Sequence, residues 1–321
     1  MKKYPSVTVL VTMKNSAHTI KKCIDSILKL DYPNKKIMCV DAFSTDGTYE
    51  ILKKYGNKIE LYQKKGNISI AYNWAYKKIN TDFIAFTNAD CVVKRDWLKK
   101  LISGFTSDDI VATAGYCSTP KKVNRLQRLI GTELEYRFKT FPEFISRAPD
   151  MNLCVRTKIA KKIPWNEKLD VTQETDWGYR LTKYGKMRYI PDAIVYHYHR
   201  ATWKNYFKQQ MKYGRNTPIL FLKHKEKIKG DHISTPFMMA EEYTFLLFLF
   251  FNLLAFLMHN IFFIISLCTF IFLLFLYLVD ILRFSSNIRD IITYYRIYLT
   301  RTIAWTIGLG FGILDIIRGK K

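Results

Sequence analysis

Three aspartates stand in the loops that follow short apolar runs of the kind that forms buried strands. Asp41 and Asp46 follow residues 36–40, and Asp90 follows residues 83–87. Carboxylates gathered at strand ends can hold a divalent cation through oxygen ligands, and they can also accept hydrogen bonds from a ribose or a base. A hard cation held there would neutralise a diphosphate and stabilise it as a leaving group. The alternative is that these aspartates are turn residues, because Ser-x-Asp and Asp-Gly sequences are common in turns.

The first ninety residues alternate between strand-like and helix-like patterns. Short apolar runs predict strands at 7–11, 36–40, 59–62 and 83–87, and helical spacing predicts helices at 20–28, 49–55 and 70–78. Such alternation is typical of an α/β fold, Rossmann-like, with a mainly parallel sheet and helices on both faces. Ligands of these sheets bind outside the carboxyl ends of the strands. The acidic loops are expected at that edge.

The chain is strongly basic and yet nearly neutral in hydropathy. It has 321 residues, with 51 Lys+Arg against 27 Asp+Glu, a formal charge of +24 and a mean hydropathy of −0.09. A disordered polycation would be poor in aromatic residues, whereas aromatic residues make up 15% of this chain. The apolar residues are therefore concentrated somewhere, and residues 243–279 contain no Asp, Glu, Lys or Arg.

This apolar run predicts two membrane spans. As one helix its roughly 37 residues would be ~55 Å long, whereas the hydrocarbon core of a bilayer is ~30 Å thick. We therefore expect spans at about 243–258 and 261–282, with a tight turn at His259-Asn260. A third apolar stretch at about 303–317 is short for a span, and it could either cross the bilayer or lie in the interface.

Basic residues lie on both sides of the predicted spans. The positive-inside rule then places both flanks in the cytoplasm. Residues 1–230 are expected to form a cytoplasmic domain, and residues 231–321 a multi-pass region of the cell membrane. The six cysteines form no Cys-x-x-Cys pair, so we expect reduced thiols rather than a zinc site.

Five elements in order resemble the family 2 glycosyltransferases, which have the GT-A fold. Residues 40–48 are similar to the family's Val-Asp-Asp-Gly-Ser-x-Asp-Gly-Thr signature, and residues 88–90 occupy the position of its Asp-x-Asp metal motif. Asn73 matches the Asn of an Ala-Arg-Asn element. Residues 173–181 resemble a Glu-Asp-x-Asp-Leu-x-x-Arg-Leu segment, and residues 209–215 fit the membrane-associated members. The resemblance covers about residues 5–216 and implies a nucleotide-sugar donor and a divalent cation, Mn²⁺ or Mg²⁺.

The resemblance also implies roles for individual residues. Those expected to bind the nucleotide-sugar are Asp41, Asp46, Asn73, Asn88, Gln210 and Arg215. Asp90 is the expected metal ligand, and His197 and His199, which alternate on a predicted strand and so point the same way, can complete the metal shell. Imidazole suits Mn²⁺-like ions better than Mg²⁺. The residues at 210 and 215 could equally belong to a solvated basic helix at the lipid headgroups.

Inverting sugar transfer needs one base that takes the proton from the attacking acceptor hydroxyl. Glu174 and Asp176 are two positions apart, so on a helix they do not share a face. By alignment with the family Glu174 is the expected base, with Asp176 as the alternate. Asp176 could instead stabilise the helix N-terminus through the macrodipole.

Four positions depart from the family pattern. Ala42 replaces the second Asp of the first signature, and Asn88 replaces the first Asp of the metal motif. Tyr72 stands where an Arg often faces the diphosphate, and Glu174 stands where the catalytic Asp is expected. These changes imply an unusual donor or a weakened enzyme.

The expected function is metal-dependent, inverting transfer of a sugar from a UDP- or GDP-sugar to a lipid-linked or glycan acceptor at the cytoplasmic membrane face. Membrane lipids are the other expected partners, and nucleic acid is not expected, since no recognised nucleic-acid motif is present. Two alternatives stay open: a non-catalytic or degenerate family member, and a basic protein that binds anionic lipid or nucleic acid. The basic residues cluster most clearly beside the spans, as attraction to anionic lipids predicts.

Overall fold

The computed structural model describes residues 4–169, 171–258 and 260–319. Within them the chain forms two compact units. The first holds the residues up to Val123 together with Arg137–Tyr198. The second holds Asn124–Tyr136 and the residues from His199 onward. The first unit therefore ends at Tyr198, and residues 199–230 group with the apolar helices rather than with the sheet.

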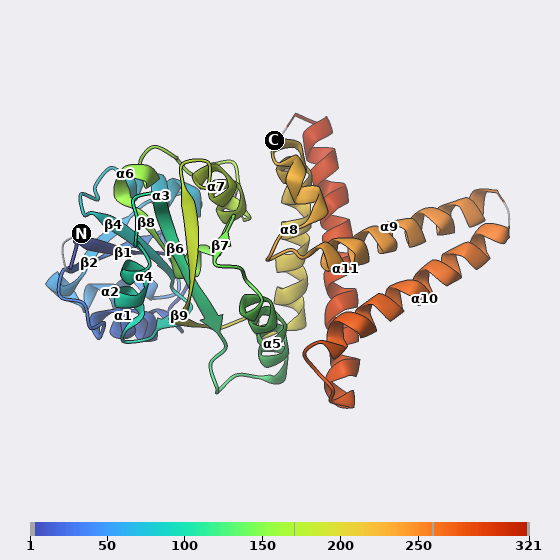
Figure 1. Ribbon diagram of the computed structural model, residues 1–321, viewed down its shortest axis with the longest axis horizontal. Helices are drawn as coiled ribbons and strands as arrows, with labels where there is room; N and C mark the ends of the chain where they lie inside the picture. The colour runs from blue at the N-terminus through green and yellow to red at the C-terminus, as the bar shows by residue number, and fades with distance from the viewer. Residues whose placement is uncertain (1–3, 170, 259, 320–321) are drawn as a thin grey trace. The chain divides into compact units, whose positions relative to one another are not determined.

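The first unit is built on one nine-stranded sheet with the order β3-β2-β1-β4-β8-β6-β9-β5, and β7 pairs with β9 (Figure 1). The strands are β1 Val7–Met13, β2 Lys35–Asp41, β3 Glu60–Gln63, β4 Phe83–Asn88, β5 Cys91–Val93, β6 Ile110–Ser118, β7 Phe144–Ile145, β8 Leu153–Arg156 and β9 Lys186–His197. β1, β2, β3 and β4 pair in parallel, and β6 pairs in parallel with β9. The mainly parallel α/β fold expected from the sequence is confirmed.

The one antiparallel insertion in the middle of the sheet is β8. It pairs antiparallel with both β4 and β6, so β4 and β6 run in the same direction and end at the same edge. β1 explains why the sheet core is stable: its sequence Val-Thr-Val-Leu-Val-Thr-Met is rich in β-branched residues and is buried throughout, as is typical of a parallel strand that is covered on both faces.

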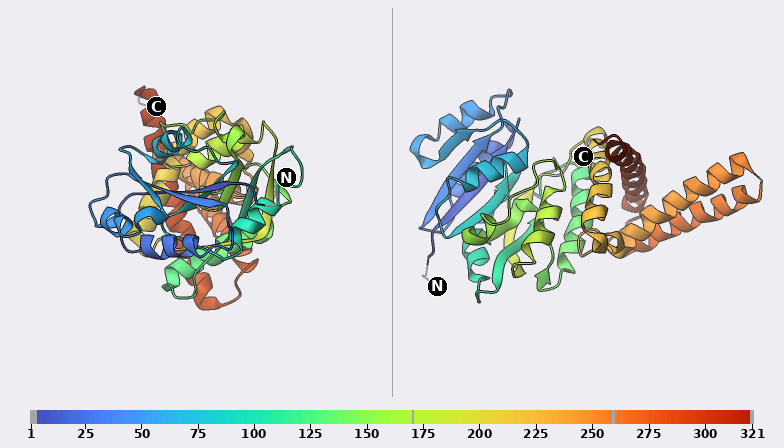
Figure 2. Two further views of the ribbon diagram at one scale, coloured as in Figure 1. Left: turned by 90° about the vertical axis from the view of Figure 1, so that its left-hand side faces the viewer. Right: turned by 90° about the horizontal axis from the view of Figure 1, so that it is seen from above.

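Helices cover both faces of this sheet (Figure 2). They are α1 Ile20–Leu28, α2 Thr48–Lys53, α3 Ile68–Tyr76, α4 Trp97–Ser103, α6 Thr157–Ala160 and α7 Gln173–Leu181, with 3₁₀ turns at Gly56–Lys58 and Asp150–Asn152. An aromatic cluster fixes α3 and α7 to the sheet: Trp165 stacks on Trp177 with ring centroids 4.5 Å apart, and Tyr72 meets Phe86 edge-on at 5.1 Å. Such ring contacts stabilise a core beyond simple burial.

The second unit is helical. It contains α8 Trp203–Lys223, a 3₁₀ turn at Lys225–Lys229, α9 Pro236–Leu257, α10 Ile261–Leu282 and α11 Ile288–Ile317, together with most of α5 Arg125–Lys139. Three of these, α9, α10 and α11, are long and apolar enough to span a membrane. α9 and α10 lie side by side as an antiparallel hairpin (Figure 1). Of the predicted turn between them, His259 lies outside the described residues.

The third apolar segment is longer than predicted. Residues 303–317 are the C-terminal half of the 30-residue helix α11. α11 packs tightly along α8, because glycines let the two backbones approach: a Cβ at Gly214 would lie 2.0 Å from the carbonyl oxygen of Trp305, and one at Gly308 would lie 2.0 Å from that of Met211. Gly312 follows Gly308 at Gly-x-x-x-Gly spacing, and a Cβ there would lie 2.2 Å from the carbonyl oxygen of Arg215, so this spacing serves packing inside the second unit.

A buried polar network joins the helices of the second unit. The Arg301 guanidinium of α11 pairs with Glu133 of α5 at 2.5 Å and with Glu241 of α9 at 2.9 Å. The hydroxyl of Tyr298 donates to the Asp280 carboxylate at 2.6 Å. Buried charges of this kind are retained only when they are paired, so the network fixes how α5, α9 and α11 meet.

Candidate active site at the carboxyl edge of the sheet

Asp90 lies in the tight turn that joins β4 to β5. The next residue, Cys91, pairs with His197 at the end of β9. The backbone carbonyl of Asp90 accepts a hydrogen bond from the Tyr198 amide at 3.1 Å. Nε2 of His197 therefore lies 3.6 Å from Oδ2 of Asp90. Both side chains are partly exposed, with 27% of Asp90 and 15% of His197 accessible.

Asp90, Cys91 and His197 fit a divalent cation in part. One ligand atom from each lies within 4.8 Å of the others. Burial raises the pKa of the Cys91 thiol well above its usual value, and a soft sulfur ligand suits neither Mn²⁺ nor Mg²⁺. A carboxylate and an imidazole remain, a donor pair that suits Mn²⁺ better than Mg²⁺. His199 belongs to the second unit, where its carbonyl accepts a hydrogen bond from Gln127 at 2.8 Å.

Asp41 is fully buried at the end of β2. Its carboxylate accepts hydrogen bonds from the Ser44 amide at 3.1 Å and from the Gln63 side chain at 3.1 Å. These contacts hold the loop 42–47 against the sheet edge. Phe43 of this loop has a φ of +55° and is 52% exposed, so the loop presents an aromatic ring to solvent two residues after the buried carboxylate. Sequence reasoning did not single out Phe43.

Asp46 braces the same loop. One of its oxygens accepts from the Ala17 amide at 2.9 Å, and the other accepts from the amide and hydroxyl of Thr48 at 3.1 and 2.5 Å. The Thr48 hydroxyl is the main reason that the pKa of this carboxyl is lowered. Because both oxygens are engaged, the geometry favours the turn-forming interpretation over direct binding of a ligand.

Asn73 and Tyr72 point into the protein. Both hydrogens of the Asn73 amide are donated, to the Trp165 carbonyl at 2.9 Å and to Glu167 at 2.8 Å, and its oxygen accepts from the Trp165 amide at 2.8 Å. Asn73 therefore anchors α3 to the loop before α7. Tyr72 is buried and donates its hydroxyl to Asp150 at 3.2 Å, so it does not stand in for an exposed arginine.

Asp150 is a site residue that sequence reasoning missed. Its carboxylate is 6% exposed and also accepts from Asn88 of the metal motif at 3.2 Å and from Gln173 of α7 at 3.3 Å. Asp150 thus links the turn that carries Asp90 to the helix that carries Glu174. Within the described residues, the Asn88 Oδ1 atom is buried and accepts no hydrogen bond.

The two acids of α7 have different surroundings. Asp176 is 2% exposed and receives the Arg180 guanidinium at 3.0 and 2.9 Å, one helical turn away. Glu174 is half-buried on another face of the helix. Asp176 is thus paired with Arg180 within α7, and Glu174 lies on a different face of the same helix.

Residues 8–163 match the family model described as glycosyl transferase family 2. This range contains the loop of Asp41 and the turn of Asp90. The chain carries a family 2 glycosyltransferase domain. The match ends before α7, so Glu174 as the base still rests on the local resemblance of residues 173–181.

Relatives of the family 2 domain are also named glycosyltransferases. The chain is 25% identical to the probable glycosyltransferase YdaM of Bacillus subtilis, over 70% of this chain and 58% of that protein. It is 25% identical to the glycosyltransferase AglE of Haloferax volcanii, over 66% of this chain and 72% of that protein. The chain therefore spans less than two thirds of the length of the first of these relatives.

The fold of the family 2 domain has solved counterparts. A mannosyltransferase from Pyrobaculum calidifontis, in complex with GDP-Man and Mn²⁺, aligns with a TM-score of 0.62 and 14% identity over 97% of this chain and 88% of that one. At this identity the likeness shows the fold alone. The GT-A fold expected from the resemblance is thereby confirmed.

Two further predicted site residues lie in the second unit. Arg215 of α8 forms a bidentate ion pair with Asp315 of α11, at 2.6 and 3.0 Å. Its guanidinium group is therefore directed at a carboxylate of this chain. Gln210 of α8 is half-buried. The role of both residues in binding the nucleotide-sugar stays a prediction.

Proposed function

We propose that this protein transfers a sugar from a UDP- or GDP-sugar to a lipid-linked or glycan acceptor at the cytoplasmic face of the cell membrane, with inversion at the anomeric carbon. The observation that carries the proposal is the pairing of Asp90 with His197 at the sheet edge where β2 ends in the buried Asp41. Three helices long and apolar enough to span a membrane favour an acceptor that is itself membrane-borne.

Asp90 and His197 would hold the divalent cation, with His199 as a further candidate ligand. A bound cation would neutralise the diphosphate and improve it as a leaving group. Asp41 would accept hydrogen bonds from the ribose or base, and the exposed ring of Phe43 would stack on the base. Asn88, two residues before Asp90, would be a further contact of the nucleotide-sugar.

Glu174 would act as the base. As the acceptor oxygen attacks the anomeric carbon, its proton passes to the Glu174 carboxylate. The new carbon–oxygen bond forms while the bond from the anomeric carbon to the diphosphate breaks, and the electron pair leaves with the nucleoside diphosphate. Asp150 would keep the metal-motif turn and α7 in register through its hydrogen bonds to Asn88 and Gln173.

The test is release of nucleoside diphosphate by the full chain in detergent, from a panel of UDP- and GDP-sugars, with and without Mn²⁺ or Mg²⁺. We expect metal-dependent release that Asp90→Ala abolishes. Asp108→Ala, which removes an exposed carboxylate in the loop before β6, is the matched control and should leave release unchanged. Metal-independent release, or full activity in Asp90→Ala, would overturn the site assignment, and no release from any donor would favour a degenerate family member.

A further inference from the structure

An interruption in the pairing of β6 with β9 opens a hollow on one face of the sheet. Gly115 pairs with Ile190, but the next residue, Tyr116, pairs with Ile194, so residues 191–193 lie outside the ladder. A bulge of this kind bends the strand and redirects the side chains on either side of it. It lies near the carboxyl ends of both strands, and its last residue, Ala193, is four positions before His197.

The bulge is held in place by specific contacts. The Asn152 amide donates to the carbonyls of Tyr116 and Ala193, at 3.0 and 2.9 Å. Opposite it, a Cβ on Gly115 would lie only 2.1 Å from the Ala193 carbonyl oxygen. The sequence therefore supplies both the amide that satisfies the looped-out backbone and the glycine that makes room for it.

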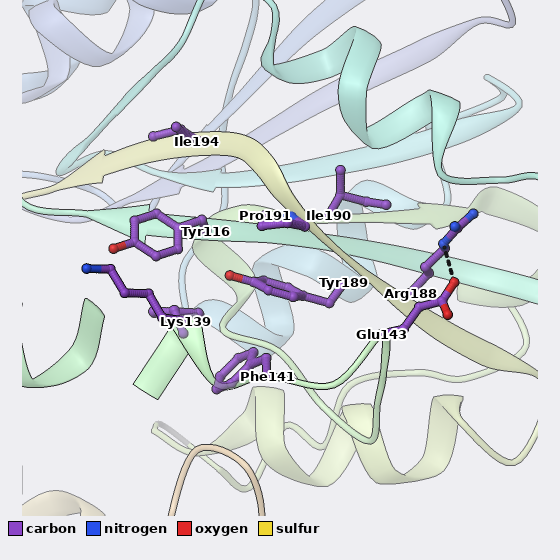
Figure 3. Close-up of a pocket in the computed structure, with 10 residues that line it drawn as sticks. Tyr116, Lys139, Phe141, Glu143, Arg188, Tyr189, Ile190, Pro191 and Ile194 are labelled. Carbon is purple, nitrogen blue, oxygen red and sulfur yellow. Dashed lines mark ion pairs between the residues drawn. The ribbon is translucent and has the colours of Figure 1, made fainter. Parts of the chain in front are cut away.

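Aromatic rings form the wall of the hollow, a cavity of about 650 Å³. Phe138 lies 5.8 Å from Tyr116 and 4.8 Å from Phe141, and Phe141 lies 5.2 Å from Tyr189, measured between ring centroids. We call this cavity, with Lys139 at its rim, the aromatic pocket (Figure 3). All of its lining residues belong to the first unit.

Hydrogen-bond donors gather at one end of the aromatic pocket. The Tyr189 hydroxyl is buried and has no hydrogen-bond partner within the described residues. Burial raises its pKa, so the hydroxyl keeps its proton. Figure 3 shows this hydroxyl, that of Tyr116 and the Lys139 ammonium turned toward the same side of the pocket. At the other end Arg188 pairs with Glu143 at 3.0 Å.

We propose that the aromatic pocket is a subsite for a sugar ring of the acceptor. A pyranose has an apolar face of C–H groups, which packs on aromatic rings, and a rim of hydroxyl oxygens, which accept from donors such as the Tyr189 hydroxyl and the exposed Lys139 ammonium. A purely apolar ligand would leave these donors without partners, which is costly for the buried hydroxyl. The inference rests on the proposed function, since it names the acceptor's recognition group.

The strand order separates this pocket from Asp41 but not from the metal ligands. Asp41 ends β2, and β1, β4 and β8 lie between β2 and β6. Asp90 lies nearer, because Cys91 pairs with His197 at the end of β9, and Ile194 of the pocket precedes His197 by three residues, about 10 Å along a strand. A sugar held in the pocket would therefore lie beside the metal ligands and away from the nucleotide-binding Asp41, where an acceptor sugar is needed.

The test measures binding of three probes to the full chain, in a detergent without a sugar headgroup and without nucleotide. The probes are methyl β-D-glucopyranoside, methyl β-D-galactopyranoside and methyl α-D-mannopyranoside, observed by saturation-transfer difference NMR. We expect at least one to bind. Tyr189→Phe, which removes one hydrogen bond and keeps the ring, should raise its Kd about fivefold. Ile194→Trp should abolish binding by filling the cavity.

Tyr184→Phe is the matched control, because Tyr184 is an exposed tyrosine outside the pocket. Absence of binding by all three probes, or an unchanged Kd in both pocket variants, would overturn the proposal. Displacement of a bound probe by UDP or GDP with Mn²⁺ would also overturn it, since the pocket would then belong to the donor. Nucleotide binding, measured separately with Mn²⁺, tests the proposed function, so the two failures are distinguishable.

Discussion

Glu174 and Asp176 differ in what surrounds them, and this difference predicts opposite effects of removing each charge. Glu174→Gln removes the proposed base, so we expect the rate of sugar transfer to fall at least about 100-fold with an unchanged melting temperature. Asp176→Asn removes the buried partner of Arg180, so it should cost about 1.5–3 kcal/mol of stability and leave most of the activity. Nucleoside-diphosphate release and thermal unfolding measure the two effects. If Asp176→Asn instead lost most of its transfer rate at an unchanged melting temperature, Asp176 would be the base and Glu174 would not.

Asp150 is predicted to act on the metal through its neighbours. Burial raises the pKa of its carboxyl, so neutralising it removes a costly buried charge, and Asp150→Asn should change stability by less than about 1 kcal/mol. The same change places an amide against the donors from Asn88, Tyr72 and Gln173. Because residues that orient a ligand typically tune metal affinity 10–100-fold, we expect the Mn²⁺ concentration for half-maximal activity to rise about tenfold.

The control for Asp150→Asn is Asp108→Asn, which neutralises an exposed carboxylate and should leave the Mn²⁺ dependence unchanged. If Asp150→Asn unfolds the protein instead, the carboxylate is a structural element and does not tune the site.

Local patterns identified the acids at strand ends and missed those that reach the site from elsewhere. Asp41 and Asp90 follow recognisable strands, and parallel strands bring their carboxyl ends to one edge. Asp150 lies 62 residues from Asn88 in a stretch without strand or helix periodicity, so only the tertiary fold shows its position. Asn73 illustrates the reverse case, since a matching motif residue proves to be tied to the Trp165 backbone.

Helices and strands were predictable where one hydrophobic pattern extended over several residues. β1, β2 and β4 were expected from apolar runs, and α1 from the spacing of Ile20, Ile24 and Ile27. The bulge in β9 was not, although Pro191 inside an extended run is a signal of interrupted pairing. The start of α11 was also missed, because its first turns carry Arg289, Asp290 and Arg296 and do not look like part of an apolar segment.

The close contact of α8 with α11 predicts opposite effects for two glycines of the same helix. Alanine is favoured over glycine inside a helix by about 1 kcal/mol. At Gly310 a Cβ meets nothing within 4 Å, so Gly310→Ala should raise the melting temperature or leave it unchanged. At Gly308 the Cβ would lie 2.0 Å from the Met211 carbonyl, so Gly308→Ala should destabilise by about 1–3 kcal/mol.

Thermal unfolding in detergent, followed by circular dichroism, measures both glycine variants. The test is whether Gly310→Ala melts at a higher temperature than Gly308→Ala. Both substitutions gain the same helix propensity, so only the contact with α8 distinguishes them. Equal melting temperatures would mean that α11 does not pack against α8 along this stripe.

At the scale of the whole molecule, the basic charge and the apolar helices divide the second unit into two kinds of surface. α9 and α10 expose large apolar side chains along their length. Each has 22 residues, about 33 Å at 1.5 Å per residue, which matches the ~30 Å hydrocarbon core. α8, in contrast, carries five Lys or Arg residues along its 21 positions. The net charge of +24 is thus concentrated partly where anionic headgroups would attract it.

This division predicts that α9 and α10 cross the membrane and that α11 does not. α11 packs against the basic helix α8 along its glycines, and its most apolar window is 39% buried, against 17% for α9 and α10. If α11 crossed the membrane, it would carry α8 into the hydrocarbon core. Each Lys or Arg placed at the bilayer centre would then cost roughly 2.5–3.5 kcal/mol of free energy. The pair is therefore expected to lie along the cytoplasmic interface.

Labelling of single cysteines with a membrane-impermeant maleimide, in vesicles of known orientation, tests this topology. The background is Cys268→Ala, since the other five cysteines are buried. We expect Ser286→Cys and Arg318→Cys, which flank α11, to be labelled from the same side, and Asn260→Cys, in the α9–α10 turn, from the opposite side. Labelling of positions 286 and 318 from opposite sides would show that α11 spans the bilayer. The Arg215–Asp315 ion pair would then have to form inside or across the membrane, where an arginine fork could no longer reach a cytoplasmic diphosphate.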